Sequence, residues 1–154
     1  MGAVPIDRHA ERNGRHAAMN TKPVLSKDDA LLMLRAAEAE ALRNHWAVSI
    51  AVCDDGGHLV AFVRLPGASP ASAAISQAKA RTAALMGRDT KAVEDMINQG
   101  RNAFLSAPGL DGMLEGGMPV IVNGQCAGAM GISGVQKQQD AQIAQAGIAA
   151  VTGA

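Results

Sequence analysis

Two basic residues, Lys79 and Arg81, stand two positions apart in an otherwise alanine-rich stretch with the composition of a helix. Side chains at positions i and i+2 do not share a helix face, so we expect one to face inward and the other to face solvent or a neighbouring subunit. An inward lysine or arginine can hold a carboxylate of a bound ligand, arginine through two parallel hydrogen bonds. The alternative is that both residues belong to a solvated helix face.

The longest irregular stretch of the sequence, residues 101–115, leads directly into the pair Gly116-Gly117. Binding and catalytic groups concentrate on long loops that a rigid scaffold holds in place. We therefore predict a ligand site that includes Ser106, Gly116 and Gly117, with Glu115 as a general base if its carboxylate is buried. The alternative is a mobile surface loop without a binding role.

Ser133 precedes the last helical pattern of the chain, which covers residues 136–151. This serine is expected in the N-cap region of that helix, and the free N–H groups at a helix N-terminus can also bind an anionic group. Asp140 falls in the first turn, where a carboxylate complements the helix dipole. That structural role for Asp140 competes with a role in proton transfer.

The composition narrows the class of ligand. The chain has 154 residues, 14 basic and 14 acidic side chains, and only 2% aromatic residues. With no net charge and few rings for base stacking, nucleic-acid binding is not expected. No apolar run reaches the roughly 20 residues that a bilayer span needs. We expect a small-molecule ligand, no membrane or nucleic-acid partner, and a homo-oligomer, since alanine-rich helices can pack against another subunit.

The amino-terminal residues differ from the rest of the chain. Residues 1–20 are predicted to be a disordered extension, because they are polar and show no steady period, and residues 21–154 to be one domain. The extension lacks the apolar segment of a secretory signal. Cys53 and Cys126 each fall in an expected strand, so we interpret them as buried hydrophobic side chains and the protein as cytoplasmic.

Helical and strand-like patterns follow one another in an order typical of an α+β domain. Ser26 with Asp29 resembles a capping box, and Asn123-Gly124 between two apolar runs is the strongest short-range hairpin signal. The expected elements are a helix to about residue 43, strands over 47–53 and 58–64, helices over 70–86 and 89–98, a hairpin within 116–134, and a helix over 136–151. Since no helix separates the paired strands, we predict an antiparallel sheet covered by helices.

Three stretches carry a family resemblance: residues 48–62 (VSIAVCDDGGHLVAF), residues 78–83 (AKARTA), and the glycine-rich hairpin over residues 116–134 with the nearby Gln139-Asp140 and Ala146-Gly147. In this order and spacing they resemble the GlcG/HbpS-like haem-binding family, which includes the carboxy-terminal domain of PduO-type proteins. The resemblance implies a profilin-like fold, with about five antiparallel strands covered by helices, and assembly into homo-oligomers. It also implies haem as the cofactor.

Haem iron is normally held by His, Cys, Met or Tyr, and the sequence contains no Tyr. His45 and His58 are weak candidates for the axial ligand, because a helix cap explains the first and an exposed strand start explains the second. Met113 and Met118 flank the glycine pair and are predicted to be pocket walls or core. There is no C-x-x-C-H motif and no cluster with metal-ligand spacing, so no other metal site is predicted.

Three functions remain open from these residues. The first is a small-molecule-binding protein that takes haem or a related tetrapyrrole between the 106–117 loop, the Lys79/Arg81 helix and the start of the last helix. The second is a cofactor-free isomerase or hydrolase for a small organic acid, with Lys79 or Arg81 holding the carboxylate and Glu115 or Asp140 moving a proton. The third is a scaffold whose main property is assembly.

Overall fold

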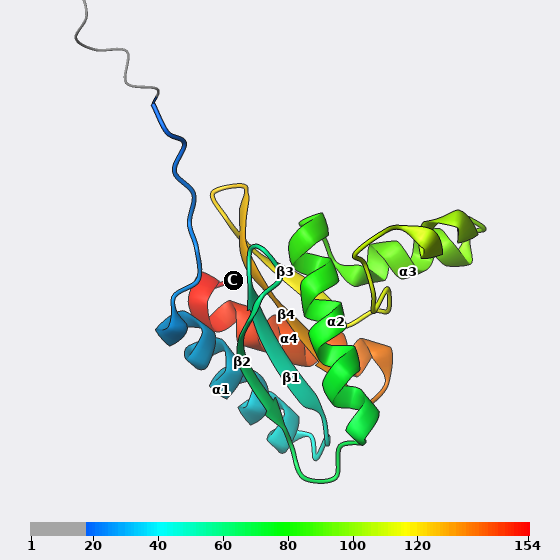
Figure 1. Ribbon diagram of the computed structural model, residues 1–154. Coiled ribbons are helices and arrows are strands. Elements are labelled where there is room, and N and C mark those ends of the chain that lie inside the picture. Colours follow the sequence, from blue (N-terminus) through cyan, green and yellow to red (C-terminus); the bar gives the residue numbers. More distant parts are fainter. Residues whose placement is uncertain (1–17) are drawn as a thin grey trace, which may run out of the picture.

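A four-stranded antiparallel sheet lies at the centre of the molecule, and helices cover both of its faces (Figure 1). The structure is a computed structural model and describes residues 18–154, so the predicted extension lies almost entirely outside the described residues. The elements are α1 (Lys27–Arg43), β1 (Ser49–Asp54), β2 (Leu59–Arg64), α2 (Pro70–Met86), α3 (Thr90–Asn98), the 3₁₀ helix η2 (Asn102–Ser106), β3 (Gly117–Val122), β4 (Gln125–Ser133) and α4 (Lys137–Thr152). The predicted α+β class and element order are confirmed.

The sheet consists of two hairpins joined through their inner strands, in the order β2-β1-β4-β3. Asn123 and Gly124 turn the second hairpin with φ values of 51° and 75°, as a two-residue type I′ turn requires. The expected count of about five strands is wrong for the described residues, which form four. The segment before α1 adds one backbone bond, from Leu25 N to Ala127 O, and no ladder that would make a fifth strand.

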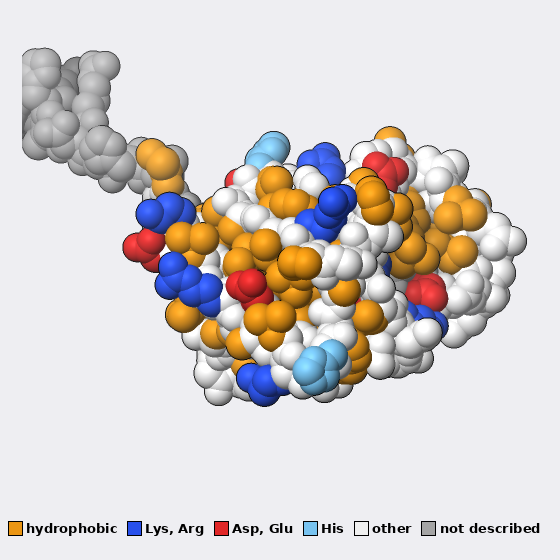
Figure 2. All heavy atoms as spheres, turned by 90° about the horizontal axis from the view of Figure 1, so that it is seen from below, with side chains coloured by type: hydrophobic (Ala, Val, Ile, Leu, Met, Phe, Trp, Pro, Cys, Tyr) orange, Lys and Arg blue, Asp and Glu red, His pale blue; other side chains and the backbone are white. Residues whose placement is uncertain are grey.

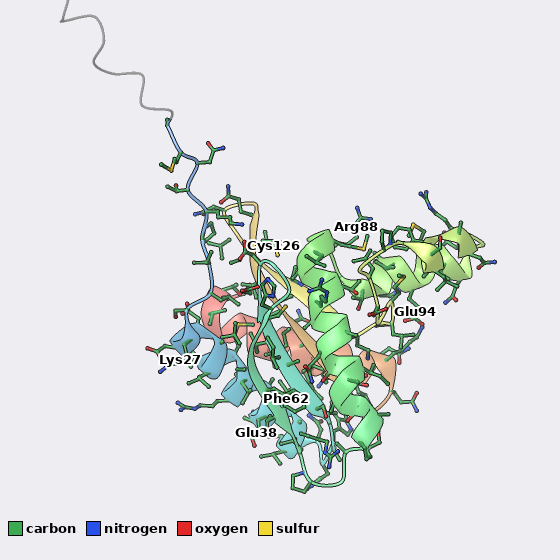
Figure 3. All side chains as sticks on the ribbon, in the orientation of Figure 1. Lys27, Glu38, Phe62, Arg88, Glu94 and Cys126 are labelled. Carbon is green, nitrogen blue, oxygen red and sulfur yellow. The ribbon has the colours of Figure 1, made fainter. Side chains whose placement is uncertain are left out.

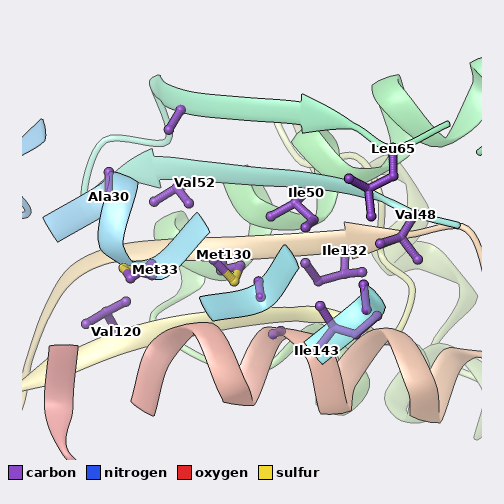
Figure 4. Close-up of a cluster of buried hydrophobic side chains, with 14 of the residues drawn as sticks. Ala30, Met33, Val48, Ile50, Val52, Leu65, Val120, Met130, Ile132 and Ile143 are labelled. Carbon is purple, nitrogen blue, oxygen red and sulfur yellow. The ribbon is translucent and has the colours of Figure 1, made fainter. Parts of the chain in front are cut away.

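The main core lies between the sheet and the pair α1 and α4, which cover the same face (Figures 1 and 4). Its largest fully buried side chains include Met33 of α1, Ile50 of β1, Met130 and Ile132 of β4, and Ile143 of α4. Aliphatic and thioether side chains of this kind fill a core that contains no aromatic ring in its buried set. The core fixes where α4 begins relative to the sheet.

Helix α2 covers the opposite face, and it approaches the sheet unusually closely. A Cβ added at Gly131 of β4 would lie 2.0 Å from the backbone oxygen of Ser76, and one at Gly117 of β3 would lie 2.4 Å from the backbone oxygen of Lys79. Small buried residues, including Ala51 and Ala80, complete this interface. Glycine in these strands therefore serves close packing of a helix backbone.

Helix α3, η2 and the loop that follows form an arm beside α2, at the right of Figure 1. The arm returns to the sheet at Gly116 and Gly117, so its last residues lie next to α2 and to the start of α4. None of the helices in the described part of the chain is both long and apolar enough to cross a membrane.

Candidate functional site

A buried ion pair joins α2 to α4. Lys79 Nζ lies 3.0 Å from Asp140 Oδ2, and each side chain is only 4% exposed. The same ammonium donates to the backbone oxygen of Ile132 in β4 at 2.8 Å. Lys79 is thus the inward residue of the predicted pair, and its ammonium is occupied by two acceptors of the protein itself.

Asp140 also secures the start of α4, because its Oδ1 accepts the backbone N–H of Val135 at 3.3 Å. Burial raises the pKa of Asp140 above its usual value, although the Lys79 ammonium and the Val135 N–H act in the opposite direction. The prediction of Ser133 in the N-cap region is wrong, since the helix is capped by Gln136. Ser133 instead ends β4 and pairs with Ser49, so the sheet ladder outweighs its local capping tendency.

Gly116 closes the ion pair off from the loop side. With φ at +120°, it occupies a conformation that L side chains rarely adopt. A Cβ at this position would lie 2.9 Å from each of Lys79 Nζ, Asp140 Cβ and the backbone oxygen of Ile132. The glycine pair therefore positions a backbone directly over two charged groups, where even a methyl group would not fit.

Glu115 directly precedes the glycine pair that covers the Lys79–Asp140 ion pair, and it has charged neighbours of its own. Its side chain is 8% exposed, and its Oε2 lies 3.8 Å from the ammonium of Lys137, at the start of α4. Glu94, labelled on α3 in Figure 3, accepts the Glu115 backbone N–H at 2.6 Å and the Lys137 ammonium at 3.2 Å. Burial favours a higher pKa for Glu94, yet these two donors together hold it below its usual value. Within residues 18–154, no donor hydrogen-bonds to the Glu115 carboxylate.

Residues within the loop segment 105–114 line a cavity of about 280 Å³ that is open to solvent on one side. Its walls are mainly apolar, with one carboxylate and one thioether, and are formed by Leu105, Leu110, Asp111, Gly112, Met113 and Leu114. Hydrophobic side chains gather on this arm, at the right of the view from below in Figure 2. A cavity of this size lies near the lower end of the range for ligand pockets, roughly 300–1,000 Å³.

Two buried threonines hold the loop against the body. Thr82 of α2 donates its hydroxyl to Asp111 O, and Thr90 of α3 donates its hydroxyl to Leu114 O at 2.5 Å. Between them, Gly112 has φ at +57°, and a Cβ there would lie 2.7 Å from atoms of α2. The loop is thereby fixed on both sides of the cavity lining, which argues for a formed site.

The other predicted residues lie elsewhere. Ser106 is exposed and donates its hydroxyl to Ala103 O within η2. Arg81 is half-buried, and its side chain packs against Gly57 in the β1–β2 turn rather than against the loop. The structure therefore brings Lys79, Asp140, Gly116, Gly117 and Glu115 together and leaves Ser106 and Arg81 apart.

His45 lines a second cavity, of about 320 Å³, between the end of α1 and the segment that follows β2. The other lining residues are Leu42, Trp46, Ala47, Leu65 and Pro66. His45 has φ at 57°, and its N–H bonds to Leu42 O while Trp46 N–H bonds to Ala41 O. This is a Schellman motif, so backbone groups cap α1 without help from the imidazole.

Comparisons with known proteins decide the family. A sequence model described as "Haem degrading protein HbpS-like" matches residues 25–149. Over 115 residues the chain is 54% identical to protein GlcG of Escherichia coli, which covers 75% of this chain and 85% of GlcG. This chain belongs to the HbpS-like family. The resemblance seen in the three sequence stretches is confirmed.

Solved structures agree with this membership. A double mutant of Streptomyces reticuli HbpS superimposes on this HbpS-like chain with a TM-score of 0.80 at 28% identity, covering 100% of both chains. A PduOC:heme complex gives a TM-score of 0.74 at 29% identity, covering 84% of this chain and 96% of that one.

The side chains that could hold haem in this HbpS-like chain line its two cavities. His58 is exposed at the end of the β1–β2 turn, and neither cavity is lined by it. Each cavity contains one side chain of a type that ligates haem iron, Met113 in the loop cavity and His45 in the other. The apolar walls and the thioether of the loop cavity fit one face of a porphyrin.

Sequence reasoning missed the residues that hold the site together. Glu94, Thr90 and Lys137 carried no motif, Thr82 stood in the stretch 78–83 without a role of its own, and each of the four acts through a partner at least 21 residues away. A polar residue inside a helix pattern is usually solvated, so only the fold could identify these four as buried or bridging.

Proposed function

We propose that this protein binds haem or a related tetrapyrrole, with the loop cavity against one face of the ring. The observation that carries the proposal is an apolar cavity lined by a thioether side chain. The cavity belongs to a chain whose family model is described as haem-degrading. A neighbouring fold solved as a heme complex supports it. When bound, haem would supply redox or oxygen chemistry at its iron, while the chain would supply apolar walls, orientation and exclusion of water.

The proposal extends to a homo-oligomer in the cytoplasm. Leu105 is 64% exposed and Leu114 is 48% exposed at the open rim of the cavity. Exposed apolar side chains around a shallow pocket favour a cover by a second copy of the chain. Light scattering checks this directly, and a monomer at micromolar concentration that still binds haem tightly would contradict a shared pocket.

A hemin titration tests the binding, followed by the Soret band in the visible spectrum. The expected result is a saturable shift relative to hemin with a protein that does not bind it. Leu110→Asp places a charge in the loop cavity, and Leu42→Asp makes the same change in the His45 cavity. We expect the first variant to weaken binding by about tenfold or more and the second to leave it unchanged.

Either of two outcomes would contradict the proposal. Absence of a saturable shift with the wild-type protein would remove haem binding altogether. Loss of binding in Leu42→Asp together with normal binding in Leu110→Asp would move the site to the cavity with His45. Circular dichroism of both variants confirms that the chain remains folded, so a change in binding reflects the cavity.

Glu115 supports a second candidate, a cofactor-free isomerase or hydrolase for a small organic acid. Its carboxylate is buried, has no hydrogen-bond donor in the described residues, and lies 3.8 Å from a lysine ammonium. Such a carboxylate can act as a general base, with the neighbouring Lys137 attracting the substrate's carboxylate, whereas the predicted anchors Lys79 and Arg81 are bound to Asp140 and packed against Gly57. Proton transfer by Asp140 would require the Lys79 pair to open.

A panel of small hydroxy and unsaturated acids, followed by NMR, tests this candidate. Glu115→Gln is expected to abolish turnover while binding of the same acid stays nearly intact. Asp95→Asn, at an exposed carboxylate on α3, is the matched control and should leave turnover unchanged. Equal loss of turnover and binding in Glu115→Gln would argue against a catalytic base.

A further inference from the structure

We infer that Met113 would hold the haem iron through its thioether sulfur. The inference rests on the proposed function and goes one step further, because it names the atom that meets the metal. Among the side chains that line the loop cavity, Met113 is the one of a type that ligates haem iron. The other lining side chain that could donate an electron pair to a metal is the carboxylate of Asp111, which is exposed to solvent.

The position of Met113 is fixed from both sides. The hydroxyl of Thr82 holds the carbonyl two residues before it, and the hydroxyl of Thr90 holds the carbonyl directly after it. Both threonines are fully buried. Gly112 lies in the left-handed region and packs directly on α2, so the backbone beside Met113 has no room to move inward. A ligand held in advance on a rigid backbone loses less entropy when it binds.

The chemistry of the neighbouring charges also favours a thioether. The Lys79 ammonium and the Asp140 carboxylate, which would otherwise compete for a ligand, lie under Gly116 and bind each other. The loop therefore presents an apolar wall and one soft, neutral donor. Neutral thioether ligation favours the ferrous state and raises the reduction potential of haem.

Three substitutions test the assignment on the protein reconstituted with haem. Met113→Leu keeps the volume of the side chain and removes the sulfur. Met118→Leu makes the same change in β3, where the side chain packs against the main core. Met113→His replaces the thioether by an imidazole. Visible spectra, electron paramagnetic resonance and the reduction potential are recorded for each.

Met113→Leu is expected to abolish the spectroscopic signature of sulfur ligation, lower the reduction potential and weaken hemin binding by about tenfold. Met118→Leu should match the wild type. Met113→His should restore a ligated spectrum at a lower potential, which a purely structural role for Met113 would not produce. A variant that unfolds is recognised by circular dichroism, and the histidine variant then decides the assignment.

The two proposals fail in different ways. Absence of a Soret shift in the wild type overturns haem binding itself. A normal Soret shift with identical spectra for wild type, Met113→Leu and Met113→His overturns the assignment of Met113 and leaves haem binding intact. In that case His45→Ala shows whether the imidazole of the second cavity is the ligand.

Discussion

The buried ion pair offers the sharpest test of how the site is built. Asp140→Ala removes the carboxylate and leaves the Lys79 ammonium, which is 4% exposed, with the Ile132 carbonyl as its remaining partner. Removing one partner of a buried pair typically costs about 3–5 kcal/mol, because the other charge stays buried without compensation. The backbone of Gly116 lies over the ammonium and separates it from solvent on the loop side.

The length of the domain determines how far this loss of stability lowers Tm. At about 3 °C per kcal/mol for a domain of this size, the loss corresponds to a decrease in Tm of about 9–15 °C. Asp95→Ala is the matched control, because Asp95 also pairs with a lysine, but the two side chains are 56% and 41% exposed. Such a surface pair contributes little, so the control should melt close to the wild type.

A double variant shows whether the stability lost in Asp140→Ala comes from the unpaired buried charge or from lost packing. Lys79→Met with Asp140→Leu replaces the pair by apolar side chains of similar volume, and we expect it to recover most of the lost stability. The raised pKa of Asp140, caused chiefly by burial, agrees with a pair whose attraction does not fully offset the desolvation of the carboxylate. Thermal unfolding followed by circular dichroism measures all four proteins at pH 7 without ligand.

Two results would refute this reasoning. A decrease below about 1 kcal/mol for Asp140→Ala, smaller than a typical unsatisfied buried group costs, would mean that the ammonium finds water or another acceptor. A double variant no more stable than the single one would mean that the carboxylate stabilises α4 mainly through the Val135 N–H. In the first case Gly116 would not be sealing the pair.

Three further predictions concern packing and the cysteines. Gly131→Ala should lower Tm far more than Gly124→Ala in calorimetry, because an added methyl would lie 2.0 Å from a backbone oxygen at the first position. At the second it meets nothing within 4 Å, so only the strain of the left-handed φ of 75° remains. Burial raises the pKa of Cys53 to about 12, so a thiol reagent at pH 8 should label half-buried Cys126 and reach Cys53 only after unfolding. The stability that protonated Cys53 contributes should be complete below the unfolded-state pKa of 9.0 and decline as pH rises toward 12.

Local signals in the sequence located the elements accurately. The Ser26–Asp29 capping box and the Asn123-Gly124 turn each depend on residues within a few positions of one another. Ser133 was misassigned because its role is set by a distant strand, to which it is paired through Ser49. Capping preference is a local tendency of about 1 kcal/mol, which a sheet ladder readily outweighs.

The sequence predicts the residues of the site one by one, but not their pairing. Lys79, Asp140 and Glu115 were each selected by residue type and local context, but nothing in their spacing paired Lys79 with Asp140, which lie 61 residues apart. Glu94 was not foreseen at all, because its bond to the Glu115 backbone depends on how the arm folds back. Partner identity in a buried network is a property of the tertiary fold.

The glycine pair divides the site into two sides with different chemistry. Beneath Gly116, two charges neutralise each other, and a ligand carboxylate could reach Lys79 only if the loop lifted away from α2. Both threonine bonds and the contact of Gly112 oppose that movement. On the outer side the loop offers apolar walls and a thioether. An organic acid needs a cationic anchor, and the residues that line the loop cavity include no lysine or arginine. The face of a tetrapyrrole needs apolar walls and a soft donor, which the same residues supply. The geometry of the cavity therefore favours haem over an organic acid.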